Sequence, residues 1–494
     1  MQEPPPVSRA RLHGDRPAIC EGQRVFTYAE LLDASARVAA SLLYGRRDLE
    51  EARVAFMSPA GFEYTAVQWG IWRAGGIAIP LSVHATGPEL EHALGDSDVE
   101  AVIVSREYLP HVERQGRRIL LADEMLEGET TPLPEISPDR RAMILYTSGT
   151  TSKPKGVVST HANLQAQTTA LIDAWDWRAD DRIPLFLPLH HIHGIVNVLG
   201  CALWSGALVE AFPRFDAHVV LPRVAAGAYT LFMAVPTIYA KLIYLLEKQT
   251  PENDAITLGF AGLRLMVSGS AALPASLHQR WAQLTGQVLL ERYGMTETGM
   301  MISNPLHGER RSGAVGQPLP GVEIRLRDEQ GGIVSNDGEP GEIQSRGPAI
   351  FSEYWNRPEA TAESFENGWF RTGDMAVRET GYYRILGRLS VDIIKSGGYK
   401  LSALEIEAAL LDHPAIRECA VVGLEDETWG ETVAVAVALE EGTGSFSLEE
   451  LQQWGKDRLS SYKHPRRLLI VDSLPRNAMG KVSKREVSGL FASI

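Results

Sequence analysis

Short apolar runs alternate with amphipathic stretches along the chain as far as about Gly313. The runs have the length of buried strands and lie at 54–57, 77–81 and 101–104. Thr27 and Glu30 have the spacing of a capping box, so we predict a helix that starts there and ends at Gly45. Strands that alternate with helices in this way predict an α/β fold with largely parallel sheets.

The pattern changes twice beyond Gly313. Short runs separated by turn residues first predict an antiparallel β region, at 322–327, 341–344 and 382–386. After Arg388 a compact α-β-β-α-β pattern begins with a helix at Ser402. We therefore predict a boundary at Ser390 between two domains. Residues 1–389 form a large N-terminal domain of α/β subdomains plus a β-rich subdomain, and residues 390–494 form a small, mobile α+β C-terminal domain.

Composition and charge exclude several classes of protein. The chain has 494 residues, 44% of them hydrophobic and only 3 cysteines, which is typical of a globular protein without a disulfide framework. Its formal net charge of −14 argues against binding to nucleic acid or to an anionic membrane surface. The longest apolar stretch, at 194–204, is far shorter than a membrane-spanning helix. We expect a cytoplasmic protein, although Arg9 and Arg11 leave a degraded organellar presequence open.

The strongest local signal is a loop of small hydroxyl residues and glycine at 146–156. It follows the apolar run 142–146, so we expect a strand that leads into it. Backbone amides and hydroxyls in such a loop bind phosphate oxygens, and Lys153 and Lys155 add positive charge. A Walker-type P-loop is excluded, because Pro154 stands where that motif requires glycine followed by lysine.

This loop resembles the phosphate-binding loop of the adenylate-forming superfamily, which comprises acyl- and aryl-CoA synthetases, adenylation domains of peptide synthetases and firefly-type luciferases. Further segments are similar to motifs of that superfamily and occur in its order, at 187–194, 293–297, 369–374, 383–388 and 475–481. The resemblance extends from Thr27 to Lys481, nearly the whole chain. It implies an enzyme that activates a carboxylic acid with ATP.

In this superfamily a carboxylate attacks the α-phosphate of ATP, and a thiol, usually that of coenzyme A, then displaces AMP. Two anions meet in the first step, so charge neutralisation and positioning dominate catalysis. The resemblance implies that Lys481 bridges the carboxylate and the α-phosphate, that Glu297 holds Mg²⁺, and that Thr296 contacts the α-phosphate. Asp374 is expected to accept hydrogen bonds from the ribose, with Arg388 beside it.

The resemblance also assigns the remaining residues of the site. The ATP and AMP site is expected to contain Thr147, Ser148, Gly149, Thr150, Thr151, Lys155, Gly269, Ser270, Ala271, Glu291, Arg292, Tyr293, Gly294 and Met295. The acyl substrate is expected to contact His191, Arg292, Ser268 and Met300, the last of which fits the hydrophobic core equally well. The thiol of coenzyme A is expected to pass a second loop formed by Ser396, Gly397, Gly398, Tyr399 and Lys400.

The small domain of these enzymes rotates between the two steps about a hinge just after the Gly-Arg pair. In this chain the hinge position is Ser390, where relatives usually have Asp or Lys. A short side chain that caps locally still permits a backbone turn.

Three histidines lie close together in the segment 187–194. A metal site would require further ligands that the sequence does not place. Alternation puts His191 and His193 on one side of the segment and His190 on the opposite side. The resemblance aligns His191 with the wall between the acyl pocket and the α-phosphate, whereas His193 is either a contact or simple packing.

The residue before Tyr293 carries information about the acid. Arg292 and its neighbours resemble the malonyl-CoA synthetases, in which the corresponding arginine pairs with the second carboxylate of malonate. A guanidinium group matches a carboxylate bidentately, as a dianionic substrate in a closed pocket requires. Alternatively, Arg292 forms a structural ion pair with an acid such as Glu291. Lys241 is a second candidate cation, or else a residue on the exposed face of a helix.

We therefore predict an AMP-forming acid–CoA ligase whose substrates are ATP, coenzyme A and a small dicarboxylate, malonate or methylmalonate, with Mg²⁺ as cofactor. The alternatives are a ligase for medium-chain or aryl acids, an adenylation enzyme that loads a carrier protein, and a non-enzymatic scaffold. The sequence predicts neither a nucleic-acid nor a membrane partner. It leaves open whether the protein is a monomer or a homodimer.

Overall fold

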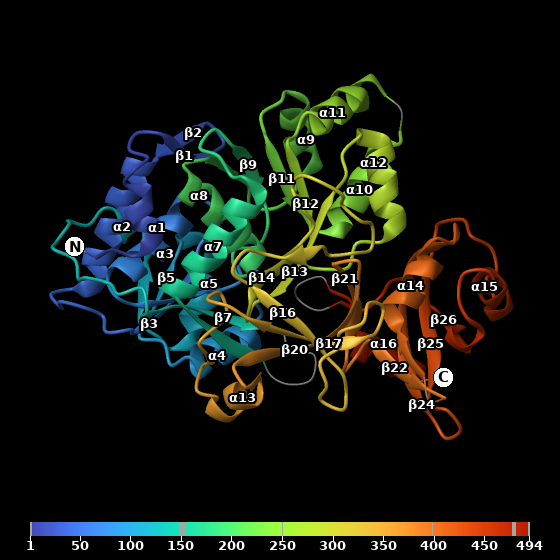
Figure 1. The fold of residues 1–494 in the computed structure, drawn as a ribbon. Helices are drawn as coiled ribbons and strands as arrows, with labels where there is room; N and C mark the ends of the chain where they lie inside the picture. The colour runs from blue at the N-terminus through green and yellow to red at the C-terminus, as the bar shows by residue number, and fades with distance from the viewer. Residues whose placement is uncertain (1, 148–153, 249, 398, 477–480, 493–494) are drawn as a thin grey trace.

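The computed structural model describes residues 2–147, 154–248, 250–397, 399–476 and 481–492. A large N-terminal part with several sheets is followed by a smaller C-terminal part, drawn in orange and red at one side of the molecule (Figure 1). Among the described residues, no helix has both the length and the apolar character that a membrane crossing requires.

The largest sheet has seven strands in the order β18-β8-β7-β4-β3-β5-β6. They are β3 (Arg53–Met57), β4 (Ile77–Pro80), β5 (Ala101–Val104), β6 (Ile119–Leu121), β7 (Arg141–Thr147), β8 (Lys155–Thr160) and β18 (Glu353–Tyr354). Every residue of β4 and β5 is buried, because elements cover both faces of the sheet. The strands β7, β4, β3, β5 and β6 pair in parallel, as the alternating pattern predicts, while β8 runs antiparallel to β7.

Two further sheets complete the α/β region. The first, in the order β2-β1-β10-β9, contains β1 (Pro17–Glu21), β2 (Arg24–Thr27), β9 (Arg182–Leu185) and β10 (Leu208–Ala211). The second, in the order β11 to β15, contains β11 (Leu231–Ala234), β12 (Leu265–Ser268), β13 (Leu290–Met295), β14 (Gly299–Ser303) and β15 (Gln317–Pro318). The strands β11, β12 and β13 are parallel, so their C-terminal ends lie at one edge.

Helices cover these sheets (Figure 1). They are α1 (Pro5–Ala10), α2 (Tyr28–Leu43), α3 (Phe62–Arg73), α4 (Gly87–Asp96), α5 (Leu109–Val112), α6 (Ala122–Leu126), α7 (His161–Trp175), α8 (Cys201–Ser205), α9 (Ala217–Ala225), α10 (Pro236–Leu246), α11 (Pro251–Ala261), α12 (Ala275–Thr285) and α13 (Pro358–Glu363). The predicted capping box begins α2: the Thr27 hydroxyl accepts from the Glu30 amide at 3.2 Å, and the Thr27 amide donates to the Glu30 carboxylate at 2.7 Å. The helix ends at Leu43, before a left-handed Tyr44.

The predicted antiparallel region is a sheet in the order β16-β17-β20-β19, with β21 paired to β20. Its strands are β16 (Glu323–Arg327), β17 (Gly341–Arg346), β19 (Phe365–Glu366), β20 (Trp369–Glu379) and β21 (Tyr382–Arg388). Asp374 in β20 lies directly opposite Arg388 at the end of β21. This register places a carboxylate beside a guanidinium group at the edge that faces the C-terminal part.

The C-terminal part has its own sheet and its own core. It contains β22 (Ile393–Ser396), β23 (Tyr399–Ser402), β24 (Ile416–Asp426), β25 (Gly430–Leu439), β26 (Arg467–Ile470), α14 (Ala403–Leu411), α15 (Leu448–Gly455) and α16 (Lys484–Phe491). Two clusters of buried apolar side chains contain only residues beyond Ile393. This separation supports the boundary at Ser390, which stays a prediction.

Candidate active site

The ends of β12 and β13 bring several predicted site residues together. Ser268 pairs in parallel with Glu291, so the segments that follow these two residues leave the sheet side by side. After β12 the chain turns at Gly269 and Ser270, and Ser270 has a left-handed φ of 71°. The C-terminal edge of a parallel sheet is where ligands bind in open α/β folds.

Asp374 is the centre of a hydrogen-bonded group at the sheet edge. Arg388 donates to its two carboxylate oxygens at 2.8 and 3.3 Å. The Tyr293 hydroxyl donates to Oδ2 at 2.5 Å. Burial opposes the charge of Arg388, but the hydrogen bonds and charge of Asp374 outweigh it and raise its pKa. The group therefore holds the Asp374 carboxylate in a fixed position next to a permanent cation.

Glu297 lies in the turn between β13 and β14 and is buried. The Tyr354 hydroxyl donates to its carboxylate at 2.9 Å, and the Lys155 ammonium lies 4.8 Å from the centre of the Tyr354 ring. Burial raises the pKa of Glu297, whereas the Tyr354 hydrogen bond and the charge of Arg388 lower it. A buried carboxylate whose tyrosine partner contacts the phosphate-loop lysine has the oxygen donors that Mg²⁺ prefers. Tyr354 was not predicted, because nothing in the sequence connects it with Glu297.

Lys481 faces the same group from the C-terminal part. Lys481 is exposed to solvent, but protein atoms surround part of its side chain. This partial burial lowers the pKa of the ammonium group. The positive charges of Arg388 and Arg292 lower this pKa further, and Asp374 opposes them. The charge of Lys481 in turn contributes to the lowered pKa of His191. The structure therefore brings Lys481 to the residues of the large domain with which the resemblance associates it.

Arg292 is a buried cation for which the described residues supply no matching anion. Only 4% of its surface is exposed, and neither Nε nor one terminal nitrogen has a hydrogen-bond partner among the described residues. The guanidinium group packs against Gly269, where a Cβ atom would lie 2.4 Å from the Arg292 Cζ atom. Burial lowers the pKa of Arg292 to about 10, so the group stays charged at neutral pH.

Glu291 does not neutralise Arg292. Neighbouring residues of a strand point to opposite faces, and the Glu291 carboxylate accepts instead from the Leu273 amide at 3.2 Å. No ion pair joins Glu291 and Arg292 in the described part of the chain. Burial raises the pKa of Glu291 to about 8, against the opposing effects of Leu273 and Arg292. The alternative of a structural ion pair between the two is therefore wrong.

The shifted pKa of Glu291 predicts a pH-dependent stability. Because the pKa rises from 4.5 to about 8 on folding, the native protein holds a proton that the unfolded chain releases. The contribution of this bound proton to the free energy of unfolding is fully present below about pH 4.5 and is lost as the pH rises through about 8. In Glu291→Gln we expect the fall in unfolding free energy between pH 5 and pH 9 to shrink by on the order of a few kcal/mol. Urea unfolding at both pH values measures it, and identical pH slopes would contradict the assignment.

The histidine segment is not a strand, so the prediction by alternation was wrong. Residues 189–191 form a turn that leads into a π-helix, η3 (His193–Gly200). His191 nevertheless lies within electrostatic range of Lys481, and burial lowers its pKa to about 3. His193 is buried, its Nδ1 lies 3.1 Å from the Ser270 hydroxyl, and its Nε2 has no partner among the described residues. Burial and the charge of Arg292 lower its pKa, so both rings are neutral at pH 7.

The loop predicted to bind coenzyme A lies at the end of β22. Ser396 is buried, while Tyr399 is exposed and stacks on Tyr462 at 4.5 Å. Gly397 has a left-handed φ of 58°, and a Cβ atom there would lie 2.6 Å from the Trp429 ring. Lys400 forms an ion pair with Glu329 of the large domain. In the described part of the chain, no hydrogen bond or ion pair joins this loop to Asp374 or Glu297.

Other predicted residues fall elsewhere. Ser148, Gly149, Thr150, Thr151 and Gly398 lie outside the described residues. Thr147 ends β7, and Lys155 begins β8, as expected for a strand that leads into the phosphate loop. Met300 is packed in the main hydrophobic core, and Ala271 is exposed. Lys241 is exposed on α10 with its ammonium 5.9 Å from the centre of the Phe215 ring, which supports the helix-surface interpretation. Ser390 is exposed in the turn that follows Arg388.

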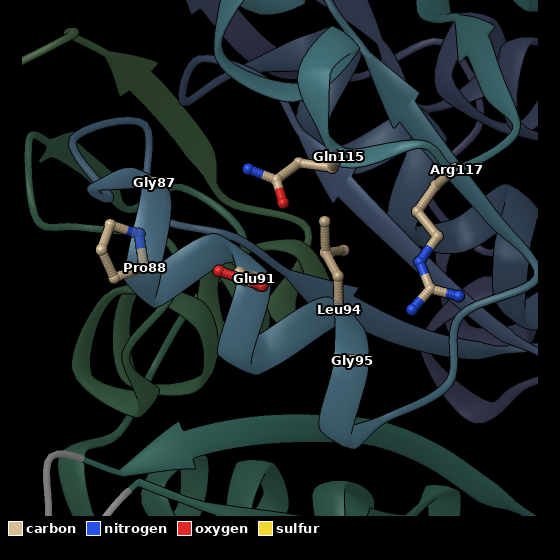
Figure 2. A pocket seen from close by; sticks show the side chains of 7 residues that line it. All are labelled: Gly87, Pro88, Glu91, Leu94, Gly95, Gln115 and Arg117. Atoms are coloured by element: carbon tan, nitrogen blue, oxygen red, sulfur yellow. The ribbon is translucent and has the colours of Figure 1, made fainter.

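A surface hollow of about 550 Å³ lies apart from these residues. Figure 2 shows α4 on one side, with Glu91 and Leu94, and Gln115 and Arg117 on the other. None of its lining residues is a predicted site residue. Across the described part of the chain, the candidate site included, no group of three or more His, Cys, Asp or Glu residues is arranged to hold a metal ion.

Comparison with known proteins identifies the family. The model of the AMP-binding enzyme family matches residues 7–355, and that of the AMP-binding enzyme C-terminal domain matches residues 405–481. The chain is 44% identical to the mitochondrial malonate–CoA ligase of Mus musculus over 98% of this chain and 90% of that protein. ATP-bound MatB from Rhodopseudomonas palustris matches with a TM-score of 0.90 and 32% identity over 99% of each chain.

A further solved structure is a malonyl-CoA ligase ternary product complex with methylmalonyl-CoA and AMP bound. It is 39% identical over 96% of this chain and 100% of that chain, and the TM-score is 0.71. These matches extend over both the large and the small domain. The chain therefore belongs to the AMP-binding enzyme family of adenylate-forming enzymes, which confirms the membership that its motifs implied.

Proposed function

We propose that the protein is an ATP-dependent ligase that joins malonate, or methylmalonate, to coenzyme A through an acyl-adenylate. The mouse relative is named a malonate–CoA ligase, and the product complex contains methylmalonyl-CoA and AMP. The observation that carries the choice of acid is the buried guanidinium group of Arg292, which has no ion-pair partner among the described residues. An acid with a second carboxylate supplies the anion that this group lacks.

The surroundings of Arg292 favour a small, doubly charged acid. The Ser268 hydroxyl and His193 Nε2 are also buried without a hydrogen-bond partner among the described residues. A buried charge is costly unless it is paired, and guanidinium and carboxylate form two parallel hydrogen bonds. Because Glu291 is largely protonated at neutral pH, it does not compete with the substrate for Arg292. A hydrocarbon chain would leave all these polar groups unsatisfied.

For the adenylation step we assign the charged residues around Asp374 to the binding of the nucleotide. Asp374 accepts hydrogen bonds from the ribose hydroxyls, and Arg388 holds the carboxylate in place. Thr296 contacts the α-phosphate. Glu297 holds Mg²⁺, which neutralises phosphate charge when bound. Lys481 stabilises the charge that develops between the carboxylate and the α-phosphate, where a preorganised donor is most effective.

The other contacts with ATP and the acid follow the same plan. The phosphate loop contributes Thr147, Ser148, Gly149, Thr150, Thr151 and Lys155, and the ends of β12 and β13 contribute Gly269, Ser270, Ala271, Glu291, Tyr293, Gly294 and Met295. The neutral ring of His191 separates the acyl pocket from the α-phosphate. Met300 forms part of the wall behind it.

For the thioester step we propose that the small domain turns about Ser390. The loop of Ser396, Gly397, Gly398, Tyr399 and Lys400 would then replace Lys481 and admit the thiol of coenzyme A. The match to ATP-bound MatB has the higher TM-score although the product complex is more similar in sequence. This difference supports assigning the present arrangement, with Lys481 facing Arg292 and Arg388, to the adenylation step.

Incubation with four acids at equal concentration tests the function. We expect AMP release that depends on ATP and coenzyme A to be fastest with malonate or methylmalonate, and slow with acetate and octanoate. A preference for octanoate would favour the medium-chain ligase instead. Release only with a carrier protein as acceptor would favour the loading enzyme. The monomer or homodimer state and the cytoplasmic location remain predictions, and the mouse relative is named mitochondrial.

Gly269→Ala tests the pocket without removing a charged group. The new Cβ would lie 2.4 Å from the Arg292 Cζ atom and displace the guanidinium group. Such overpacking costs about 1–3 kcal/mol, so we expect kcat/KM for malonate to fall by roughly 10- to 100-fold. Turnover of acetate should change much less. Gly262→Ala is the matched control, because its Cβ would meet only ordinary contacts at 3.5 Å or more. Equal losses for both acids would contradict the predicted role.

A further inference from the structure

The helix that follows Lys481 begins in a buried group of three charges. The Lys484 ammonium lies 2.7 Å from the Asp392 carboxylate and 2.7 Å from the Glu407 carboxylate. The three side chains are only 11%, 17% and 13% exposed. They come from α16, from the turn after β21 and from α14, so the ion pairs join three separate elements of the chain.

Each carboxylate of this group has a second partner on the backbone. The Val421 amide donates to Glu407 Oε1 at 2.7 Å. The Arg388 amide donates to Asp392 Oδ2 at 3.0 Å, while Oδ1 faces Lys484. Arg388 is the residue whose guanidinium group holds Asp374. Asp392 therefore connects the ribose end of the site directly to Lys484.

The chain between Lys481 and Lys484 has little freedom. Val482 forms a β-bridge with Arg476, and the Ser483 amide donates to the Pro475 carbonyl at 2.9 Å. Lys481 comes directly before this bridge, and Lys484 follows two residues after it. Fixing the Lys484 ammonium therefore also fixes the direction in which the chain leaves the bridge toward Lys481.

We propose that Lys484 is a positioning residue for Lys481: its ion pairs with Asp392 and Glu407 hold the segment that carries the ammonium of Lys481 against the Arg388 end of the site. Arg388 is hydrogen-bonded to Asp392, and Asp392 forms an ion pair with Lys484. Lys484 lies three residues after Lys481, whose ammonium is in turn within electrostatic range of Arg388. The effect on turnover rests on the adenylation reaction proposed above. The effect of Lys484 on the position of Lys481 does not depend on that reaction.

The position of Lys481 can be measured without substrate. Labelling with acetic anhydride at a series of pH values, followed by mass spectrometry of the Lys481 peptide, reports the pKa of its amine. In the wild type this pKa is lowered by burial, Arg388 and Arg292. We expect it to return toward 10.5 in Lys484→Met, because the ammonium leaves these neighbours. Lys484→Arg, which keeps the cation, should retain the lowered value.

A surface ion pair of α14, the helix that contains Glu407, provides the control. Glu405 pairs with Lys463 at 2.6 Å and lies in α14 two residues before Glu407. Glu405→Gln makes the same chemical change as Glu407→Gln but leaves Lys484 untouched. We expect Glu407→Gln to shift the titration of Lys481 and Glu405→Gln to leave it unchanged. If Lys484→Met does not fold, Glu407→Gln and Asp392→Asn test the same ion pairs with nearly isosteric changes.

Half-reactions distinguish positioning from general support of the fold. Malonate-dependent exchange of pyrophosphate into ATP should fall roughly 10²-fold in Lys484→Met, the scale of a misplaced catalytic group. Thioester formation from preformed adenylate should stay within about twofold. The double variant Lys481→Ala/Lys484→Met should exchange no more slowly than Lys481→Ala alone, because the second change acts through the first residue.

Three results would overturn the proposal: an unchanged titration of Lys481 in folded Lys484→Met, equal shifts in Glu405→Gln and Glu407→Gln, or additive losses in the double variant. A wild-type protein without any exchange would instead overturn the proposed function. The labelling experiment would still decide the positioning role, since it requires neither ATP nor malonate.

Discussion

Replacing Lys481 with alanine should reduce adenylation by about 10²-fold or more, the scale of a lost transition-state donor. The ammonium lies within electrostatic reach of Arg292, Arg388, Asp374 and His191, where the carboxylate and the α-phosphate are proposed to meet. Thioester formation from preformed adenylate should be largely spared, because charge between the two anions no longer develops in that step. Pyrophosphate exchange and single-turnover thioester formation measure the two steps separately.

Lys456→Ala is a suitable control for this experiment. It removes an exposed lysine of the same domain, whose ammonium bonds only to Gln453 among the hydrogen bonds of the described residues. We expect both half-reactions to stay at the wild-type rate in that variant. If Lys481→Ala slowed both half-reactions equally, the role assigned to Lys481 would be wrong.

Replacing Arg292 with methionine should remove the preference for dicarboxylates. Truncating one member of a buried charge pair costs about 2–5 kcal/mol of binding, so kcat/KM for malonate should fall by roughly 10²-fold or more. Acetate lacks the second carboxylate, and its turnover should be retained. Stability should not decrease, because replacing a buried, uncompensated charge by an apolar side chain of similar volume is neutral or stabilising.

Lys241→Met provides the matched control for Arg292→Met. It removes the second candidate cation, which is exposed and lies near the Phe215 ring. We expect unchanged selectivity in this variant. A loss of malonate preference in Lys241→Met, or its retention in Arg292→Met, would assign recognition of the second carboxylate to a different group.

Local patterns predicted much of the fold, because the elements concerned carry their own signals. The capping box at Thr27, the strand before the phosphate loop and the antiparallel region after Gly313 each follow from neighbouring residues. The π-helix from His193 was not predicted, because the alternation of histidine and apolar residues in that segment fits a strand equally well. Periodicity alone does not distinguish short apolar segments.

The candidate site was predictable only through motifs that resemble a known superfamily. Asp374 and Arg388 were named as neighbours, and their paired register in β20 and β21 confirms that they lie together. The contacts of Tyr354 with Glu297, of Gly269 with Arg292 and of Asp392 with Lys484 depend on chain segments far apart in sequence. Contacts of this kind leave no local pattern in the sequence, so they are seen only in the three-dimensional structure.

Exchange of labelled pyrophosphate into ATP, without coenzyme A, tests the central claim most directly. A protein that forms an acyl-adenylate and recognises a second carboxylate through Arg292 should exchange rapidly with malonate and far more slowly with acetate at equal concentration. Absence of exchange with any acid, or equal exchange with malonate and acetate, would contradict the account.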